Sequence, residues 1–256
     1  MAAHARREPA GPGSAVDSHA ATRDTGTTPL VPATARGEAT RRRILDAAEE
    51  VFGELGYYEA SVSEITRRAG VAQGTFYIYF HSKRETFVEL VEDIGARLRA
   101  ATSSAIRGAT NRLEAERLGF EAFFRFIYEH QRIYRIVEDA RRVAPAAARD
   151  YYRRISTGYE RGLATAMQAG QIREDNVEAL AYMLMGIGHF VAWRWLIWPS
   201  DESAEQQDGH EGREGHGASE GHDGRRQWQD AVLPDEVFAA VMEFITHGLA
   251  PAPAPR

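Results

Sequence analysis

Two serine–glutamate pairs divide one short stretch of the chain into compact helical segments. Ser61 with Glu64, and Ser82 with Glu85, have the spacing of a capping box, in which each side chain bonds the other residue's backbone N–H at a helix start. Between them, Gly70 is the type of residue that ends a helix. The stretch therefore predicts two short helices in succession and then a longer one.

A further helix is expected immediately before this stretch. From Ile44 to Leu55, apolar residues recur at the spacing of one core-facing stripe, and Gly56 is positioned to end the helix that begins near Thr40. With the short helices expected over 61–70 and 72–80, this gives three helices with a glycine turn between the second and third. That order is a helix-turn-helix arrangement.

The rest of the chain keeps a helical period. Helices are predicted at about 113–130, 131–142, 145–169, 176–198 and 235–248, and Asp175 with Glu178 is expected to cap the fourth of these. We find no run with strand character. The predicted fold class is all-α.

Composition and motifs exclude several classes of protein. The chain has a net charge of -6 and no cysteine, so disulfides and thiolate chemistry are excluded. No apolar run reaches the roughly 18 to 20 residues of a membrane span, because Arg194 interrupts the run 183–198, and Arg6 and Arg7 precede no signal-like apolar region. No catalytic constellation or glycine-rich nucleotide motif is present. We therefore expect a cytoplasmic protein that is not an enzyme, needs no cofactor and has no membrane partner.

The short helix over 72–80 combines a buried face with a polar one. Phe76 and Phe80 are one turn apart and are suited to packing on the preceding helix. Gly74 costs about 1 kcal/mol against alanine inside a helix, which is understandable if the backbone must approach another surface closely.

The polar face has the chemistry of a DNA reader. Gln73 can pair with an adenine edge and Ile78 can pack on a thymine methyl group. The hydroxyls of Thr75 and the neighbouring tyrosines suit phosphates, as does Lys83 at a helix N-terminus. Residues 61–85 carry a local charge of 4 − 2 = +2 within the acidic total, so this helix is expected to enter a DNA groove.

At these residues the sequence resembles the TetR family of transcriptional regulators. The matching segments are TRRRILDAAEEVFGELGY and SVSEITRRAGVAQGTFYIYFHSKRE. The resemblance implies that bases are faced by Gln73, Gly74, Tyr77 and Ile78, that phosphates are held by Thr75, Tyr79 and Lys83, and that Arg41 and Ser63 are further DNA contacts. Ala72 stands where the family often has a serine cap, and Tyr79 stands where histidine is frequent.

The resemblance also implies a domain organisation and partners. We expect a disordered arm over 1–36, the helix-turn-helix DNA-binding domain over 37–84, an effector-binding and dimerisation domain over 85–250, and a disordered tail over 251–256. The expected partners are double-stranded DNA with a palindromic operator, a small-molecule effector and a second copy of the chain. Repression relieved by the effector is the leading hypothesis.

The second domain is rich in aromatic residues that could surround an apolar ligand. The candidate effector-binding residues are Phe120, Phe124, Ile127, Tyr128, Tyr152, Tyr159, His189 and Trp193. Ordinary core packing explains the same residues one by one. His189 and Trp193 lie on an almost wholly apolar helix that could instead form the dimer interface with the last helix. The arginines of DARRV and YYRR could hold a fatty acid or an acyl-CoA.

A histidine-rich insert at about 200–229 leaves one alternative function open. His210, His216 and His222 are spaced six residues apart in a repeat. Three imidazoles could bind Zn²⁺ or Ni²⁺, which would make the chain a metal-responsive sensor. A mobile loop without a ligand explains the same letters, so no metal site is assigned.

Overall fold

In the computed structural model, residues 34–198 and 232–251 are described, and all regular elements among them are helical. The all-α prediction is confirmed. The arm before Thr34, the histidine-rich insert and the tail fall outside the described residues.

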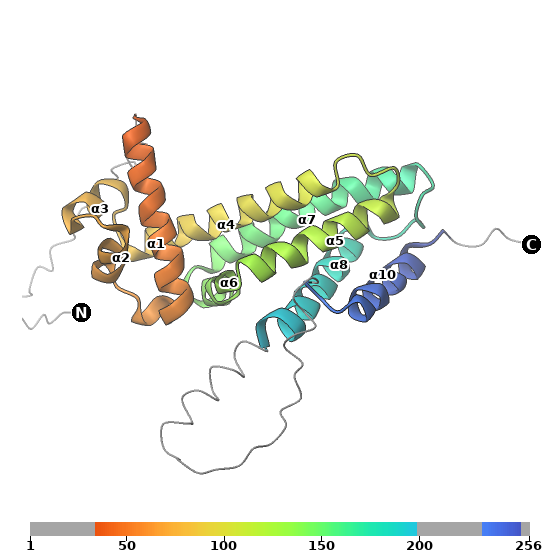
Figure 1. Ribbon diagram of the computed structural model, residues 1–256. Coiled ribbons are helices and arrows are strands. Elements are labelled where there is room, and N and C mark those ends of the chain that lie inside the picture. The colour runs from red at the N-terminus through yellow and green to blue at the C-terminus, as the bar shows by residue number, and fades with distance from the viewer. Residues whose placement is uncertain (1–33, 199–231, 252–256) are drawn as a thin grey trace, which may run out of the picture.

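The first three helices form a compact unit at one end of the molecule (Figure 1). They are α1 (Ala35–Glu59), α2 (Val62–Ala69) and α3 (Gln73–Tyr79). Ser61 caps α2 by accepting a hydrogen bond from the Glu64 amide at 3.1 Å. Gly70 follows α2 in the left-handed conformation with a φ of 63°, which turns the chain into α3.

Apolar side chains from all three helices hold this unit together. Phe76 of α3 and Phe80, the residue that follows α3, are fully buried. Ile65 of α2 and Ile44 and Phe52 of α1 are fully buried as well. The predicted packing face of α3 is confirmed. Since a helix of seven residues is unstable by itself in water, its position depends on these contacts.

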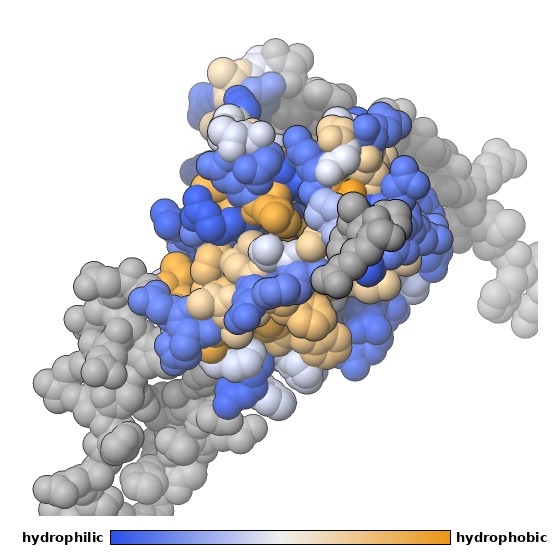
Figure 2. Space-filling model, turned by 90° about the vertical axis from the view of Figure 1, so that its right-hand side faces the viewer, coloured by the Kyte–Doolittle hydropathy of each residue, from blue (hydrophilic) through white to orange (hydrophobic). Residues whose placement is uncertain are grey.

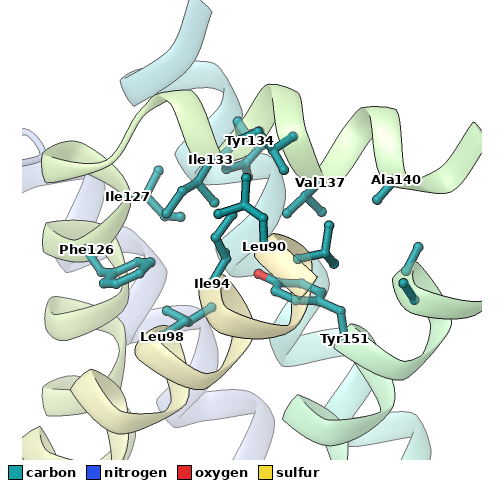
Figure 3. Packing of buried hydrophobic residues seen from close by; sticks show 14 of the residues in the cluster. Leu90, Ile94, Leu98, Phe126, Ile127, Ile133, Tyr134, Val137, Ala140 and Tyr151 are labelled. Atoms are coloured by element: carbon teal, nitrogen blue, oxygen red, sulfur yellow. The ribbon is translucent and has the colours of Figure 1, made fainter. Parts of the chain in front are cut away.

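The remaining helices form a bundle that extends away from the first unit (Figure 1). It contains α4 (Lys83–Ala105), α5 (Arg112–Glu129), α6 (Arg132–Val143), α7 (Pro145–Gln168), α8 (Val177–Ala192), the π-helical turn η1 (Trp193–Ile197) and α10 (Asp235–Leu249). α4 packs against α5 and α7, while α8 packs on α7 and α5. Figure 3 shows side chains from four helices meeting, including Ile94 of α4, Ile127 of α5, Val137 of α6 and Tyr151 of α7.

Three predicted boundaries differ from the structure. α1 begins at Ala35 rather than near Thr40, because its first turns are solvent-exposed and so carry no apolar stripe. Gly56 does not end α1 but bends it, with a φ of 76°. Asn176, not Asp175, caps α8 by accepting from the Ala179 amide at 2.9 Å.

α6 joins the first unit to the bundle. Arg135 Nη1 donates to the Glu54 carbonyl oxygen at 2.7 Å, and Asp139 Oδ2 accepts from the Tyr57 amide at 2.8 Å. Arg132 pairs with the Glu54 carboxylate at 2.9 Å. These bonds fall at the bend in α1, where the Arg135 guanidinium lies so close to Gly56 that a β-carbon there would be 3.1 Å from Nη2.

α8 and η1 form one continuous apolar segment, and the expectation that no segment is long enough to cross a membrane is wrong by length. Within residues 34–198 and 232–251, Val177–Ile197 is the only helix with the length and composition of a membrane span. The apolar run considered in the sequence begins at Met183, whereas the helix begins six residues earlier, at Val177. In its most apolar stretch, 39% of the residues are buried inside the protein.

Candidate nucleic-acid interface and ligand cavity

The outer face of α3 is exposed to solvent. Tyr77 is 49% exposed and Ile78 is 52% exposed, and Gln73 and Gly74 are also on the surface. Apart from its chain neighbours and the helix backbone, no atom of the described residues lies within 4 Å of the position that a β-carbon on Gly74 would take. Packing among these residues therefore gives no reason for this glycine, and the four residues predicted to face bases form one accessible surface.

The other predicted contacts on α2 and α3 are less uniform. Ser63 is exposed, whereas Thr75 and Tyr79 are half-buried, and Tyr79 packs against the apolar core. Ala72 makes no side-chain cap for α3, as the sequence indicates. The hydroxyl groups of Thr75 and Tyr79 accordingly sit at the edge of the exposed surface.

Lys83 has three intramolecular hydrogen-bond partners. Its Nζ donates to the carbonyl oxygens of Tyr57 at 2.8 Å, Ala60 at 2.7 Å and Tyr58 at 3.3 Å, and it lies 4.5 Å from the Tyr57 ring centroid. An ammonium group has three N–H donors, and all of them are directed at the end of α1. Lys83 thus ties α4 to the carbonyls that the end of α1 leaves open, and its contact with a phosphate stays a prediction.

Arg41 also has an intramolecular partner. Its guanidinium pairs with Glu89 of α4 and lies 5.3 Å from the ring of Phe80. Arg67 and Arg68 of α2 both bond Glu64, and these two guanidinium groups lower the pKa of that carboxyl to about 2. The predicted basic character of this region is thus largely neutralised. Between residues 34 and 90, exposed arginines without a described carboxylate partner are Arg36, Arg43 and Arg84.

A cavity of about 210 Å³ lies inside the helical bundle. It exceeds the roughly 150 Å³ of an engineered cavity that admits benzene. Residues from α4 to α8 line it, and its wall is mostly apolar, with Phe120, Phe123, Ile127, Ile133, Val137 and Leu184 among its members. Five of the predicted residues do line it: Phe120, Ile127, Tyr152, Tyr159 and His189.

A buried ion pair closes one part of the cavity wall. Arg112 Nε donates to Glu116 Oε1 at 2.8 Å, and the side chain of Glu116 is 1% exposed. The Arg112 guanidinium also lies 5.6 Å from the ring of Tyr159. Burial raises the pKa of Glu116, while Arg112 and a hydrogen bond with the Tyr159 hydroxyl oppose this.

A second polar group lies where α6 meets α8. The Tyr134 hydroxyl donates to the His189 carbonyl oxygen at 2.6 Å and lies 3.1 Å from His189 Nδ1, with the two rings stacked at 5.2 Å. Burial lowers the pKa of His189. His189 therefore reaches the cavity as a largely neutral imidazole whose position is set by Tyr134.

The other three predicted ligand residues do not line this cavity. Phe124 is buried in the core outside the cavity, where its ring meets Phe238 at 6.4 Å. Tyr128 is 52% exposed on α5. Trp193 turns away onto Phe190 and Trp198.

Most polar residues that line the cavity were not predicted from the sequence. Arg141, Arg142 and Arg153 pair with neighbouring acidic residues on the surface, and the arginines that line the cavity are instead Arg99 and Arg112. Glu116 and Tyr134 were also not foreseen. An i,i+4 Arg–Glu pair is such a common surface feature that the spacing of Arg112 and Glu116 gave no signal of burial.

These features define a helix-turn-helix protein whose second domain is a helical bundle with an internal cavity. Residues 44–90 match the model of a family described as bacterial regulatory proteins, tetR family. This segment of the chain is therefore similar to the DNA-binding part of TetR-family regulators, as the sequence motifs indicated.

Known relatives are similar to part of this chain. An uncharacterized HTH-type transcriptional regulator YdgC of Bacillus subtilis is 36% identical over 105 residues, which are 40% of this chain and 54% of the relative. The HTH-type transcriptional activator FasR of Mycolicibacterium smegmatis is 35% identical over 38% of this chain and 44% of its own length. The chain thus spans about half the length of these relatives.

Solved structures share the fold along more of the chain. The transcriptional regulator FadR from Bacillus subtilis, in complex with stearoyl-CoA, has a TM-score of 0.60 at 21% identity, covering 81% of this chain and 98% of that one. The fatty acid degradation regulator FadR from Bacillus halodurans has a TM-score of 0.56 at 24% identity, covering 60% and 83%. At these identities the likeness describes the fold alone.

Replacing Lys83 by methionine tests its structural role. We expect the variant to lose about 2 kcal/mol of unfolding free energy, since three carbonyls lose a charged donor, in urea denaturation followed by circular dichroism. Arg84→Met, at the next residue and exposed, is the control and should change stability by less than about 0.5 kcal/mol. Equal stability of Lys83→Met and the natural protein would contradict the role assigned to Lys83.

The buried ion pair gives a second prediction. Glu116→Ala leaves Arg112 unpaired and should cost about 3–5 kcal/mol of unfolding free energy, whereas the double variant Arg112→Met with Glu116→Leu should recover most of that loss. The exposed pair Arg117–Glu121 on the same helix is the control, and removing it should cost about 0.5 kcal/mol or less. Similar losses for both pairs, measured by urea denaturation, would mean that the Arg112–Glu116 pair is not held in a dry wall.

Proposed function

We propose that the protein is a ligand-responsive, sequence-specific transcriptional regulator that binds a palindromic operator as a homodimer and is released from it by a small, largely apolar effector. The observation that carries this proposal is the pairing of an exposed α3 surface with a mostly apolar cavity in the bundle, joined through α6. The similarity to TetR-family regulators and the regulators among its relatives support the same function.

DNA reading is assigned to α3. Gln73, Tyr77 and Ile78 project from a helix that the core beneath it fixes in place. Amide and apolar groups of this kind discriminate base edges in a major groove. A β-carbon at Gly74 would meet no side chain among the described residues, which suits close approach of the backbone to DNA. The hydroxyls of Thr75 and Tyr79, two half-buried residues beside the exposed face, suit phosphates.

Dimerisation is assigned to α8 and α10. Phe190 is 63% exposed, Phe244 is 68% exposed, and Ile187, Val191 and Trp195 border a groove between these helices. Figure 2 looks onto the end of the molecule where α10 lies and shows apolar residues gathered beside polar ones. Soluble monomers rarely expose such a surface, and a matching pair of helices from a second copy would cover it. We assign the apolar α8 to this interface rather than to a membrane.

Effector control is assigned to α6. One side of this helix contributes Ile133, Tyr134 and Val137 to the cavity, and the other side bonds the end of α1 through Arg135 and Asp139. A ligand that displaces the first set moves the second, and with it the unit that carries α3. Release of DNA then requires that the effector binds the displaced state more tightly.

The metal-responsive alternative is not carried forward. It rested on His210, His216 and His222, which lie outside the described residues, and none of the relatives or structures described above supports it. Within residues 34–198 and 232–251, no group of three or more His, Asp or Glu residues is placed to hold a metal ion.

Selection of the purified protein on random duplex DNA tests the assignment of α3. We expect a palindromic sequence whose half-sites are about 34–36 Å apart. Gln73→Ala should lose about 1–3 kcal/mol of preference for one base position, measured by fluorescence anisotropy at several salt concentrations. The exposed Tyr128→Ala on α5 is the control and should bind as the natural protein does. Enrichment of no sequence, with binding that depends only on salt, would reject the operator.

Sedimentation equilibrium tests the assignment of α8 and α10. The natural protein is expected to be a dimer at micromolar concentration, and Phe190→Glu and Phe244→Glu should each shift it to a monomer, because a charge would be buried unpaired at the interface. Tyr128→Glu, on a different exposed aromatic residue, should remain a dimer. A natural protein that sediments as a monomer would rule out this interface.

A further inference from the structure

One cationic side chain in the cavity wall lacks a carboxylate partner. Of the two arginines that line the cavity, Arg112 is paired with Glu116, whereas Arg99 of α4 forms no ion pair or side-chain hydrogen bond with the residues that the structure describes. Its guanidinium is half-buried. A planar guanidinium with free N–H donors binds a carboxylate through two parallel hydrogen bonds.

A second unused donor lies beside Arg99. A β-carbon at Gly95 would be 2.9 Å from Cδ2 of Tyr151 and 3.1 Å from Nη1 of Arg99, so both side chains pack on the same glycine. The Tyr151 hydroxyl has no hydrogen-bond partner among the described residues, and Figure 3 shows Tyr151 reaching from α7 toward α4. Burial raises the pKa of Tyr151, so the hydroxyl stays protonated and remains a donor.

The charges around Arg99 favour an anion. Both acidic residues of the wall already have cationic partners, Glu116 with Arg112 and Glu138 with Arg141 at 3.6 Å. The rest of the wall is mainly apolar and aromatic. A ligand that enters the cavity therefore contacts one positive charge without a carboxylate partner among the described residues, and an otherwise mainly apolar lining.

The location of Arg99 indicates where a charged group would sit. Ser103 and Ile106, one and two turns further along α4, line the cavity and are also exposed. Residues with both properties mark the opening of the cavity to solvent. Arg99 thus lies on the same helix as the opening, while Phe120, Ile133 and Leu184 are deep in the wall.

We propose that the cavity binds an amphiphile with a single carboxylate head, held by Arg99, and an apolar chain that extends among the buried aromatic and aliphatic residues. This inference rests on the proposed function, because it names the chemical class of the effector. One unpaired guanidinium matches one negative charge. The nucleotide part of a coenzyme A ester carries several negative charges and would have to remain outside a cavity of about 210 Å³.

Isothermal titration of the full chain with matched ten-carbon probes tests this proposal. Decanoate should bind the natural protein about tenfold more tightly than decan-1-ol, a difference of about 1.4 kcal/mol. Arg99→Gln should abolish that ratio by weakening decanoate alone, and Arg99→Lys should keep part of it. Arg153→Gln, an exposed arginine on α7 that pairs with Asp150, should behave as the natural protein does.

Three results would overturn the proposal: equal binding of decanoate and decan-1-ol, an unchanged ratio in a folded Arg99→Gln variant, or tight binding of decanoyl-CoA with none of decanoate. Thermal melting of Arg99→Gln confirms that the variant is folded. Arg99→Lys keeps the positive charge without the guanidinium shape. If Arg99 acted only through packing, this variant would not keep the preference for decanoate over decan-1-ol.

The same samples separate this inference from the proposed function. Each is titrated onto the selected operator DNA with and without decanoate. If decanoate binds through Arg99 but leaves DNA affinity unchanged, the cavity assignment stands and the proposed release of DNA fails. If decanoate does not bind while the operator is still selected, the carboxylate assignment fails and the DNA-binding function stands.

Discussion

A seven-residue helix is not stable in water without tertiary contacts, and this constraint determines how the first three helices pack. Nucleation of so short a helix is unfavourable in water, so α3 exists only because Phe76 and Phe80 are buried against α1 and α2. Anchoring one face so firmly leaves the opposite face free to carry residues that contribute nothing to folding. Gly74 weakens the helix, and a β-carbon there would contact no side chain in the part of the protein that the structure describes; it is tolerated for the same reason.

The same logic explains how two separate tasks share one chain. The first unit must keep a rigid outer surface, while the bundle must keep an interior space that a well-packed core would fill. α6 meets both requirements because its apolar side faces the space and its charged side bonds the bend of α1. Glu54 is central to this junction, since its carboxylate pairs with Arg132 of α6 and with Arg68 of α2. Hydrogen bonds and ion pairs therefore connect α6, at the cavity, to α1 and α2 without a flexible linker between them.

Local chemistry was predictable from sequence, whereas the choice of partners was not. Ser61, Gly70 and Ser82 signalled the helix ends correctly because caps and glycine turns are set by neighbouring residues. The intramolecular bonds of Lys83 were not predicted, because its carbonyl partners come from residues 23 to 26 positions earlier, and no spacing rule reports such a contact. Within the bundle, periodicity placed Phe120, Ile127 and His189 on inward faces, but it could not separate cavity from core, and Phe124 does not line the cavity. Arg99 and Arg112 look like any surface arginine until the helices are packed.

The engagement of Lys83 has a practical consequence for watching this protein move. It is the only lysine in the chain, so it carries the only side-chain primary amine, and the carbonyls at the end of α1 surround that amine. An ammonium group held in this way reacts slowly with acylating reagents until the junction between α1 and α4 opens. The chain thus contains one natural chemical reporter, placed where the first unit meets the bundle. Its acylation rate would record local opening there without any introduced label.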